Sequence, residues 1–171
     1  LEQMIVIPAG LPPHKQIPAV SATPEERFFM TQLAFSEMEH VTVSDIELLR
    51  KGKSYTYDTL CLLKEKYPEA CFYLCVGTDM LQSFETWYQS KKIAQMCTLA
   101  VASRHWGDQA KIEEKAAFLQ TTLEAQVKIV ELDVIDISST ELRTAAAKGM
   151  LPGLIPAKVW HYIKEKNLYG M

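Results

Sequence analysis

The sequence lacks the features that mark membrane, secreted and nucleic-acid-binding proteins. No apolar run among its 171 residues reaches the roughly 18 to 20 residues that a membrane span needs, and no signal-like segment precedes the first apolar stretch. A net charge of −3 argues against a dominant surface for nucleic acid or anionic lipid. This net charge does not exclude a small basic pocket. We therefore expect a cytoplasmic protein without a nucleic-acid or membrane partner.

Cysteine is scarce, and its spacing fits neither a metal site nor a disulfide framework. A C-x-x-C pair is the usual sign of a zinc or redox site. The four cysteines include no such pair. Cys71 and Cys75 lie four residues apart on an expected strand, so their side chains face the same side. We predict that all four are reduced, buried packing residues. They are Cys61, Cys71, Cys75 and Cys97.

What the sequence does contain is an alternation of β-rich apolar runs and helical patterns. With 48% hydrophobic and 23% charged residues, the chain can bury one core, and we expect a single domain over residues 1–171. Strands separated by helices indicate parallel pairing through right-handed crossovers. The predicted fold class is α/β, a doubly wound parallel sheet covered on both faces.

The expected elements follow from apolar periodicity and from start signals such as Thr23, Pro24 and Glu26 at a helix N-terminus. The expected strands are 4–7, 41–48, 71–76, 98–103 and 127–132. The expected helices are 24–40, 55–67, 108–122, 139–148 and 156–166, with a shorter helical region between 77 and 96.

Cations, hydroxyls and aromatic rings follow several of these strands. In parallel α/β sheets, ligands bind beyond the carboxyl ends of the strands, so these residues are expected to gather at one edge. Two arginines, a lysine and a histidine among them suit an anionic ligand. The candidates are His14, Lys15, Asp79, Trp87, Tyr88, Arg104, Ser138, Ser139, Thr140 and Arg143.

The stretch DISSTELR, residues 136–143, has two interpretations. Ser138 and Glu141 form the pattern of a capping box, which by itself accounts for the hydroxyl and the carboxylate. A helix side chain leans toward the N-terminus, however, so Arg143 adds positive charge to an end that is already positive. A bound phosphate turns that conflict into a binding site with N–H, hydroxyl and guanidinium donors.

The other candidates also have purely structural interpretations. Asp79 can cap the helix after Gly77, and Trp87 with Tyr88 can be core aromatics. His14 and Arg104 can be ordinary surface residues. The position of these residues at successive strand ends favours the functional interpretation.

Six segments, in order, resemble the bacterial nicotinate-mononucleotide adenylyltransferases. They are PAGLPPHK, SYTYDTL, GTDMLQSFETWY, VASR, ISSTELR and LIPAKVWHYIKEKNLY. The resemblance extends over essentially the whole chain and implies a Rossmann-like nucleotidyltransferase fold. Other adenylyltransferases, such as the pantetheine-phosphate ones, share the ISSTELR pattern, whereas SYT and TWY narrow the choice to nicotinate mononucleotide.

The resemblance implies adenylyl transfer from ATP to nicotinate mononucleotide, giving nicotinate adenine dinucleotide and pyrophosphate in NAD biosynthesis. Such a reaction needs no protein nucleophile, so catalysis rests on aligning two anions and neutralising charge. Mg²⁺ is expected to arrive with ATP, and no protein metal site is predicted. Two alternatives remain: another acceptor, phosphopantetheine or nicotinamide mononucleotide, or a nonenzymatic nucleotide-binding module. A homo-oligomer is left open.

The resemblance also assigns roles to the candidate residues. Ser139, Thr140 and Arg143 are implied to hold ATP phosphates as the catalytic set, with Ser138 as their structural neighbour and Arg104 on the same side. In the substrate set, His14 and Lys15 flank a phosphate, Asp79 accepts from the ribose and Trp87 stacks on the pyridine. Backbone N–H groups near Thr56 and Tyr88 receive the nicotinate carboxylate, with Tyr55 beside them.

One family motif is missing from the sequence. The family's glycine-rich turn, G-x-F-x-P-x-H-x-G-H, does not occur, and none of the four histidines, His14, His40, His105 and His161, forms an H-x-G-H pair. The chain opens with Leu1 at the expected second strand of the family. We therefore expect an N-terminally incomplete domain, short of roughly 25 to 35 residues, one βα unit, with little or no activity alone. The alternative is a degenerate, noncatalytic remnant.

Overall fold

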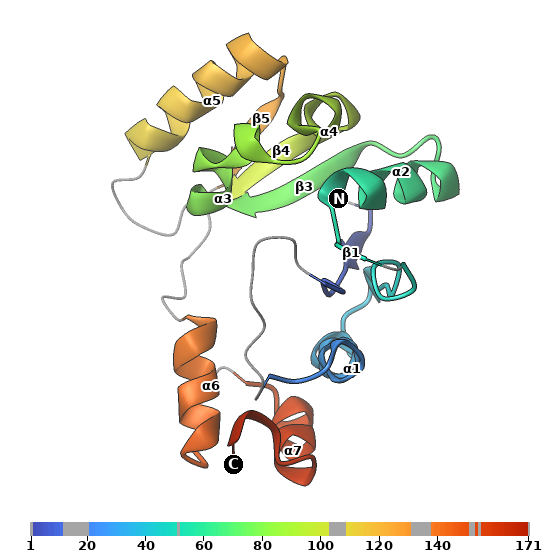
Figure 1. Cartoon of the computed structure of the whole chain (residues 1–171), viewed down its shortest axis with the longest axis vertical. Helices are drawn as coiled ribbons and strands as arrows, with labels where there is room; N and C mark the ends of the chain where they lie inside the picture. The colour runs from blue at the N-terminus through green and yellow to red at the C-terminus, as the bar shows by residue number, and fades with distance from the viewer. Residues whose placement is uncertain are drawn as a thin grey trace. The chain divides into compact units, whose positions relative to one another are not determined.

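The chain, drawn in Figure 1, folds as two units. Each unit has its own hydrophobic core. The first unit consists of Leu1–Ser54 together with Ile137–Met171, and the second is Tyr55–Asp136. The structure is a computed structural model. It describes residues 2–11, 21–50, 52–102, 109–130, 138–150, 153 and 155–170.

The second unit is built on a three-stranded parallel sheet with the order β3-β4-β5. In the register, Phe72 lies opposite Cys97, and Leu99 lies opposite Val127. Helices occupy the connections between the strands, as expected for parallel pairing. The strands are β3 (Phe72–Gly77), β4 (Cys97–Ala102) and β5 (Val127–Val130). The helices are α2 (Thr56–Lys66), α3 (Thr78–Gln82), η1 (Phe84–Thr86), α4 (Ser90–Met96) and α5 (Gln109–Leu123).

One face of this sheet forms the core of the unit with its helices. Leu99 and Val101 of β4 are fully buried there, together with Phe84 of η1 and Ile112 of α5. Alternate side chains of a strand point to opposite faces. Tyr73 therefore points to the other face, where its side chain is exposed. The core thus fixes α2, α3, α4 and α5 against one side of the sheet.

The prediction of four buried cysteines is wrong for Cys71 and Cys75, which are exposed. They lie at or on β3, the edge strand of the three-stranded sheet, on the face opposite the core. Cys97 is buried, and burial raises the pKa of its thiol to about 11, while Cys61 is partly buried. All four thiols are free, as predicted.

The first unit contains a two-stranded parallel sheet and a group of helices. Met4 of β1 lies opposite Val41 of β2, and an isolated parallel bridge joins Leu11 to Lys53. Helix α1 packs against α7, and α6 packs against η2, around a core that includes Trp160. The elements are β1 (Met4–Val6), α1 (Pro24–Phe35), β2 (Val41–Val43), α6 (Ser139–Ala147), α7 (Ala157–Glu165) and η2 (Leu168–Gly170).

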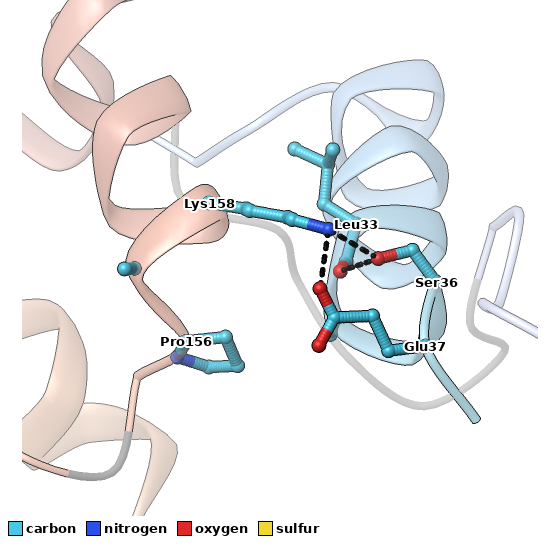
Figure 2. A pocket seen from close by; sticks show the side chains of 7 residues that line it. Leu33, Ser36, Glu37, Pro156 and Lys158 are labelled. Carbon is cyan, nitrogen blue, oxygen red and sulfur yellow. Dashed lines mark hydrogen bonds and ion pairs between the residues drawn. The ribbon is translucent and has the colours of Figure 1, made fainter.

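A groove of about 210 Å³ lies between α1 and α7 (Figure 2). Lys158 crosses it, donating hydrogen bonds to Glu37 Oε1 at 2.8 Å and to Ser36 Oγ at 3.2 Å. The same hydrogen bond and charge lower the pKa of Glu37. Leu33 and Pro156 are also part of the lining. None of the candidate ligand-binding residues that the structure describes is part of this lining.

Every strand pair in the described residues is parallel. Together with the intervening helices, this pairing confirms the α/β class predicted from the sequence. None of the helices that the structure describes has the length and apolarity needed to cross a membrane.

Candidate functional site

The candidate residues divide between the two units. Ser138, Ser139, Thr140 and Arg143 belong to the first unit and are called the α6 donor group below. Tyr55, Thr56, Asp79, Trp87 and Tyr88 belong to the second unit. The predictions for His14, Lys15 and Arg104 fall outside the described residues.

A capping box opens helix α6, as the sequence predicted. Ser138 is the N-cap, and its hydroxyl oxygen accepts from the Glu141 N–H at 3.2 Å. In return, the Glu141 carboxylate accepts from the Ser138 N–H at 2.7 Å. These hydrogen bonds lower the pKa of Glu141. The helix therefore starts at Ser139 with a fixed geometry.

Several donors remain at this helix start after the cap has formed. A helix leaves its first N–H groups without intrahelical partners, and the capping box uses only those of Ser138 and Glu141. The N–H groups of Ser139 and Thr140 form no hydrogen bond within the described ranges. Both residues are exposed. The N-terminus of α6 thus presents free backbone donors to solvent, the arrangement that binds phosphate in proteins.

Arg143 turns back toward the same end of α6. Its Nη2 donates to Thr140 Oγ1 at 3.2 Å, and its side chain is exposed. This confirms that Arg143 leans toward the N-terminus and adds its charge to the positive end of the helix dipole. Hydroxyl, backbone and guanidinium donors therefore converge on the first turn of α6.

A second arginine lies in the same unit. Arg27 of α1 donates from Nη2 to the Gly10 carbonyl oxygen at 3.0 Å, just after β1. Both guanidinium groups act on the Tyr169 hydroxyl. Burial raises the pKa of this hydroxyl, and the positive charges of Arg143 and Arg27 oppose that rise. Two positive charges thus act on one region of the first unit, which favours an anion there.

In the second unit, Asp79 follows the carboxyl end of β3. The N-cap of α3 is Gly77, and no side chain caps this helix, so the interpretation of Asp79 as the cap is wrong. Its carboxylate is exposed and forms no hydrogen bond within the described residues. The adjacent Thr78 is buried, and its Oγ1 has no hydrogen-bond partner in the described part of the chain. The Asp79 carboxylate at this strand end is therefore accessible to a ligand, whereas the Thr78 hydroxyl is buried.

Trp87 is anchored to the core through Phe84. Their ring centroids lie 5.3 Å apart, and the backbone N–H of Trp87 donates to the Phe84 carbonyl oxygen at 3.0 Å. Phe84 is 0% exposed, whereas Trp87 is half-buried. After Tyr88 the chain turns through Gln89 in the left-handed region, φ 57°, and enters α4. The indole is therefore held against the core while part of the Trp87 side chain stays accessible.

Tyr88 packs on the first turn of α2. Its ring centroid lies 4.8 Å from that of Tyr55 and 6.1 Å from that of Tyr57, the latter in an edge-on arrangement. Tyr88 is nevertheless 49% exposed. Lys92 Nζ lies 5.3 Å from the centroid of the Tyr57 ring. These four side chains are called the tyrosine cluster below.

Two backbone donors flank the tyrosine cluster. The N–H groups of Thr56, the first residue of α2, and of Tyr88 form no hydrogen bond with any described residue. No side chain caps α2. Because ring contacts join Tyr88 to both neighbours of Thr56, these two free N–H groups belong to one packed assembly.

An ion pair supports the turn that carries Trp87. Lys115 of α5 donates to Glu85 Oε1 at 2.5 Å, and this contact lowers the pKa of Glu85. The Ser90 hydroxyl donates to the Glu85 carbonyl at 3.1 Å. The segment before Tyr88 is thus held from both α5 and α4.

Sequence reasoning missed three of these supporting residues: Tyr57, Lys92 and Lys115. The repeat of tyrosine on either side of Thr56 was a usable signal for Tyr57. Lys92 follows Tyr88 by four residues, but this spacing does not place Lys92 near the tyrosines unless the start of helix α4 at Ser90 is known. For Lys115, separated from Glu85 by 30 residues, the local sequence carried no signal.

The chain is similar to proteins of known family. A profile described as cytidylyltransferase-like matches residues 1–145. A Synechococcus sp. (strain JA-2-3B'a(2-13)) relative, named a probable nicotinate-nucleotide adenylyltransferase, is 36% identical over 171 residues, which cover 99% of this chain and 83% of the relative. A relative of the same name from Clostridium botulinum (strain Hall) is 34% identical over 172 residues, covering 99% and 85%.

Solved structures show a similar fold. The Plasmodium falciparum nicotinic acid mononucleotide adenylyltransferase complexed with NaAD aligns with a TM-score of 0.76 at 19% identity, over 99% of this chain and 83% of that one. This likeness confirms the Rossmann-like nucleotidyltransferase fold that the sequence predicted. On the profile match and the sequence identities, the chain belongs to the cytidylyltransferase-like family and, within it, to the nicotinate-nucleotide adenylyltransferases.

Proposed function

We propose that this chain carries the sites for adenylyl transfer from ATP to nicotinate mononucleotide. The observation that carries the proposal is the α6 donor group. Its free N–H groups, its hydroxyls and the returning Arg143 give a helix start with the donors that a phosphate needs,. Relatives at 34–36% identity bear the name of this activity, and the Plasmodium falciparum protein was solved with NaAD and with APC.

In the proposed reaction, the α6 donor group holds the phosphates of ATP. Ser139 and Thr140 donate from their backbone N–H groups, and Arg143 places its guanidinium against the negative charge. The acceptor phosphate attacks the α-phosphorus and pyrophosphate leaves, so the protein supplies alignment and charge neutralisation rather than a nucleophile. ATP enters with a divalent cation, for which we propose Mg²⁺. In the described ranges, no group of three or more His, Cys, Asp or Glu side chains is placed to hold a metal.

The second unit is proposed to hold nicotinate mononucleotide. The partly exposed Trp87 ring stacks on the pyridine ring, and the free N–H groups of Thr56 and Tyr88 receive the carboxylate. Asp79, exposed at the end of β3, accepts from a ribose hydroxyl. The roles implied for His14, Lys15 and Arg104, contacts to phosphate, remain part of the proposal.

The sequence contains no H-x-G-H pair, so we expect slow turnover by this chain and test its function first by binding. Isothermal titration of the full chain should show saturable binding of ATP and of nicotinate mononucleotide. Replacing Trp87 by Ala should weaken the mononucleotide about tenfold or more, because one aromatic stack is lost. ATP affinity should stay within about twofold, since the stacking contact is specific to the acceptor.

The alternatives give different results in the same titration. A chain that binds phosphopantetheine or nicotinamide mononucleotide more tightly than the nicotinate form serves another acceptor. Equal losses of ATP and acceptor affinity in the Trp87→Ala variant would contradict the stacking role. A chain that binds ATP but no acceptor is a nucleotide-binding module instead.

A further inference from the structure

We propose that Tyr57, with Lys92 held over its ring, is a positioning residue that makes the acceptor site prefer a carboxylate to a carboxamide. This inference rests on the proposed function, because it concerns the same mononucleotide site. It adds two residues to which neither the sequence patterns nor the comparisons assign a role. Both belong to the second unit, in which all the contacts that support the proposal lie.

The two carboxylate donors come from separate segments. The Thr56 N–H belongs to the start of α2, and the Tyr88 N–H belongs to the turn before α4. These segments are more than 30 residues apart in the sequence, so their spacing must be set by side-chain packing. Edge-on and tilted ring pairs contribute beyond simple area burial and have defined geometry.

Two tyrosine rings at the start of α2, those of Tyr55 and Tyr57, contact the Tyr88 ring. Tyr55 is the N-cap residue and precedes the helix. Tyr57 lies inside the first turn, and its ring meets that of Tyr88 edge-on at 6.1 Å. Because Tyr57 is built into the helix, its contact links the position of Tyr88 to the helix itself. Removing the Tyr57 ring should therefore shift one N–H donor relative to the other.

Lys92 adds a positive charge to this cluster. It is exposed on the first turns of α4, and its Nζ lies 5.3 Å from the Tyr57 ring centroid. This cation–π contact holds the ammonium beside the tyrosine cluster. A positive charge there stabilises an anionic carboxylate and has little effect on a neutral carboxamide. The neighbouring Lys91 is directed elsewhere, to Glu124 Oε1 at 3.1 Å.

A carboxylate and a carboxamide respond differently to misplaced donors. A carboxylate has two acceptor oxygens and can use both N–H groups at once, with charge-assisted hydrogen bonds. A carboxamide offers one acceptor oxygen, and its NH₂ group faces the second donor without forming a bond. Precise spacing of the two N–H groups thus favours the acid, and loss of that spacing should reduce the preference.

The test is a titration of the full chain and four variants with nicotinate mononucleotide, nicotinamide mononucleotide and ATP. Tyr57→Leu removes the ring, and Tyr57→Phe keeps it. We expect Tyr57→Leu to weaken the nicotinate form about tenfold, with the nicotinamide form and ATP within about twofold. Tyr57→Phe should behave like the unmodified chain.

Lys92→Gln and Lys91→Gln form a matched pair, because each removes one positive charge from the same helix. Lys92→Gln should weaken only the nicotinate form, about threefold, and Lys91→Gln should weaken nothing. Both lysines are exposed, so these variants keep the test valid even where Tyr57→Leu does not fold.

The outcomes separate this inference from the proposed function. If the unmodified chain binds no mononucleotide, the proposed function itself is wrong. If it prefers the nicotinate form and Lys92→Gln leaves that preference unchanged, the role of Lys92 is overturned. If Tyr57→Leu folds and weakens both mononucleotides equally, Tyr57 has only a packing role, and the proposal fails.

Discussion

At the scale of single residues, Gly10 lies where the first unit leaves almost no room for a side chain. It is buried just after β1, and its carbonyl accepts from Arg27. A Cβ added there would lie 2.6 Å from the Glu47 carbonyl oxygen and 3.1 Å from Ser54 Oγ. Backbone atoms cannot move away as a flexible side chain can, so Gly10→Ala should lower the free energy of unfolding by about 1 to 3 kcal/mol. Thermal unfolding monitored by circular dichroism measures this loss of stability.

Gly153 provides the control for this substitution. A Cβ at Gly153 meets no atom within 4 Å, so Gly153→Ala should change stability by no more than about 0.5 kcal/mol. Equal melting temperatures for Gly10→Ala and Gly153→Ala would show that the close approach at Gly10 relaxes without cost. A selective loss in Gly10→Ala would support the tight packing around Gly10.

The sequence predicted local residue roles better than distant ones. The capping box of Ser138 and the backward lean of Arg143 depend on neighbours within one helical turn, and both predictions are confirmed. The exposure of Cys71 and Cys75 depends instead on which strand forms the edge and which face the helices cover. That information is spread over the whole unit, so apolar character alone led to the wrong burial.

At the scale of elements, α6 joins a structural cap to a proposed phosphate site, and substitutions of Ser138 separate the two roles. Ser138→Ala removes the cap, at a cost of about 1 kcal/mol, and should speed hydrogen exchange at Glu141 and Leu142. Ser138→Asp keeps a capping oxygen but adds a negative charge beside the donors. We expect Ser138→Asp to preserve exchange protection and to weaken ATP binding about tenfold.

Acid provides a second probe of the same cap. The pKa of Glu141 is lowered from its ordinary value of 4.5 by its hydrogen bonds to Ser138. The carboxylate therefore contributes stability above that value, and the contribution is lost as the pH falls through the lower folded pKa. In Ser138→Ala this acid-dependent part of the stability should shrink.

For the phosphate role of α6, tight ATP binding by Ser138→Asp would be the contradicting result. Ser138→Thr is the control, because it keeps both the cap and the phosphate site.

Element ends were less predictable than element types. Helix α1 begins at Pro24 with the predicted capping box but ends at Phe35 rather than at residue 40. The Ser36 hydroxyl donates to the Leu33 carbonyl at 3.0 Å, which satisfies a terminal acceptor,. His40 then adopts a left-handed φ of 46° before β2 begins. Apolar periodicity continues past such a stop, so it cannot locate the end.

At the scale of the whole molecule, the two cores have different origins in the sequence. All buried residues of the second core come from one continuous stretch, between Leu60 and Ala125. The first core combines residues of α1 with residues of α6, α7 and η2, from segments about a hundred residues apart. Alternating strands and helices predict the α/β class, but which distant segments share a core depends on tertiary packing that no local pattern encodes.

This difference predicts how fragments behave. Residues 55–136 contain a complete core and a three-stranded parallel sheet, so this fragment should fold alone, with marginal stability because small domains bury less of their surface. Residues 1–54 lack the partners of Met30 that α7 supplies, so this fragment should remain unfolded. Circular dichroism and hydrogen exchange on the two separate fragments measure both expectations.

A substitution of Leu99 tests whether the core of the second unit stabilises the 55–136 fragment. Its side chain is 0% exposed at the centre of the second core, and Leu99→Ala should cost about 2 to 5 kcal/mol. A loss of that size is comparable to the whole stability of a small domain, so Leu99→Ala should unfold the 55–136 fragment. Leu62→Ala, at a partly exposed position on α2, should leave it folded. If the unmodified fragment shows neither cooperative melting nor protected amides, its core is not sufficient, and the second unit depends on the rest of the chain.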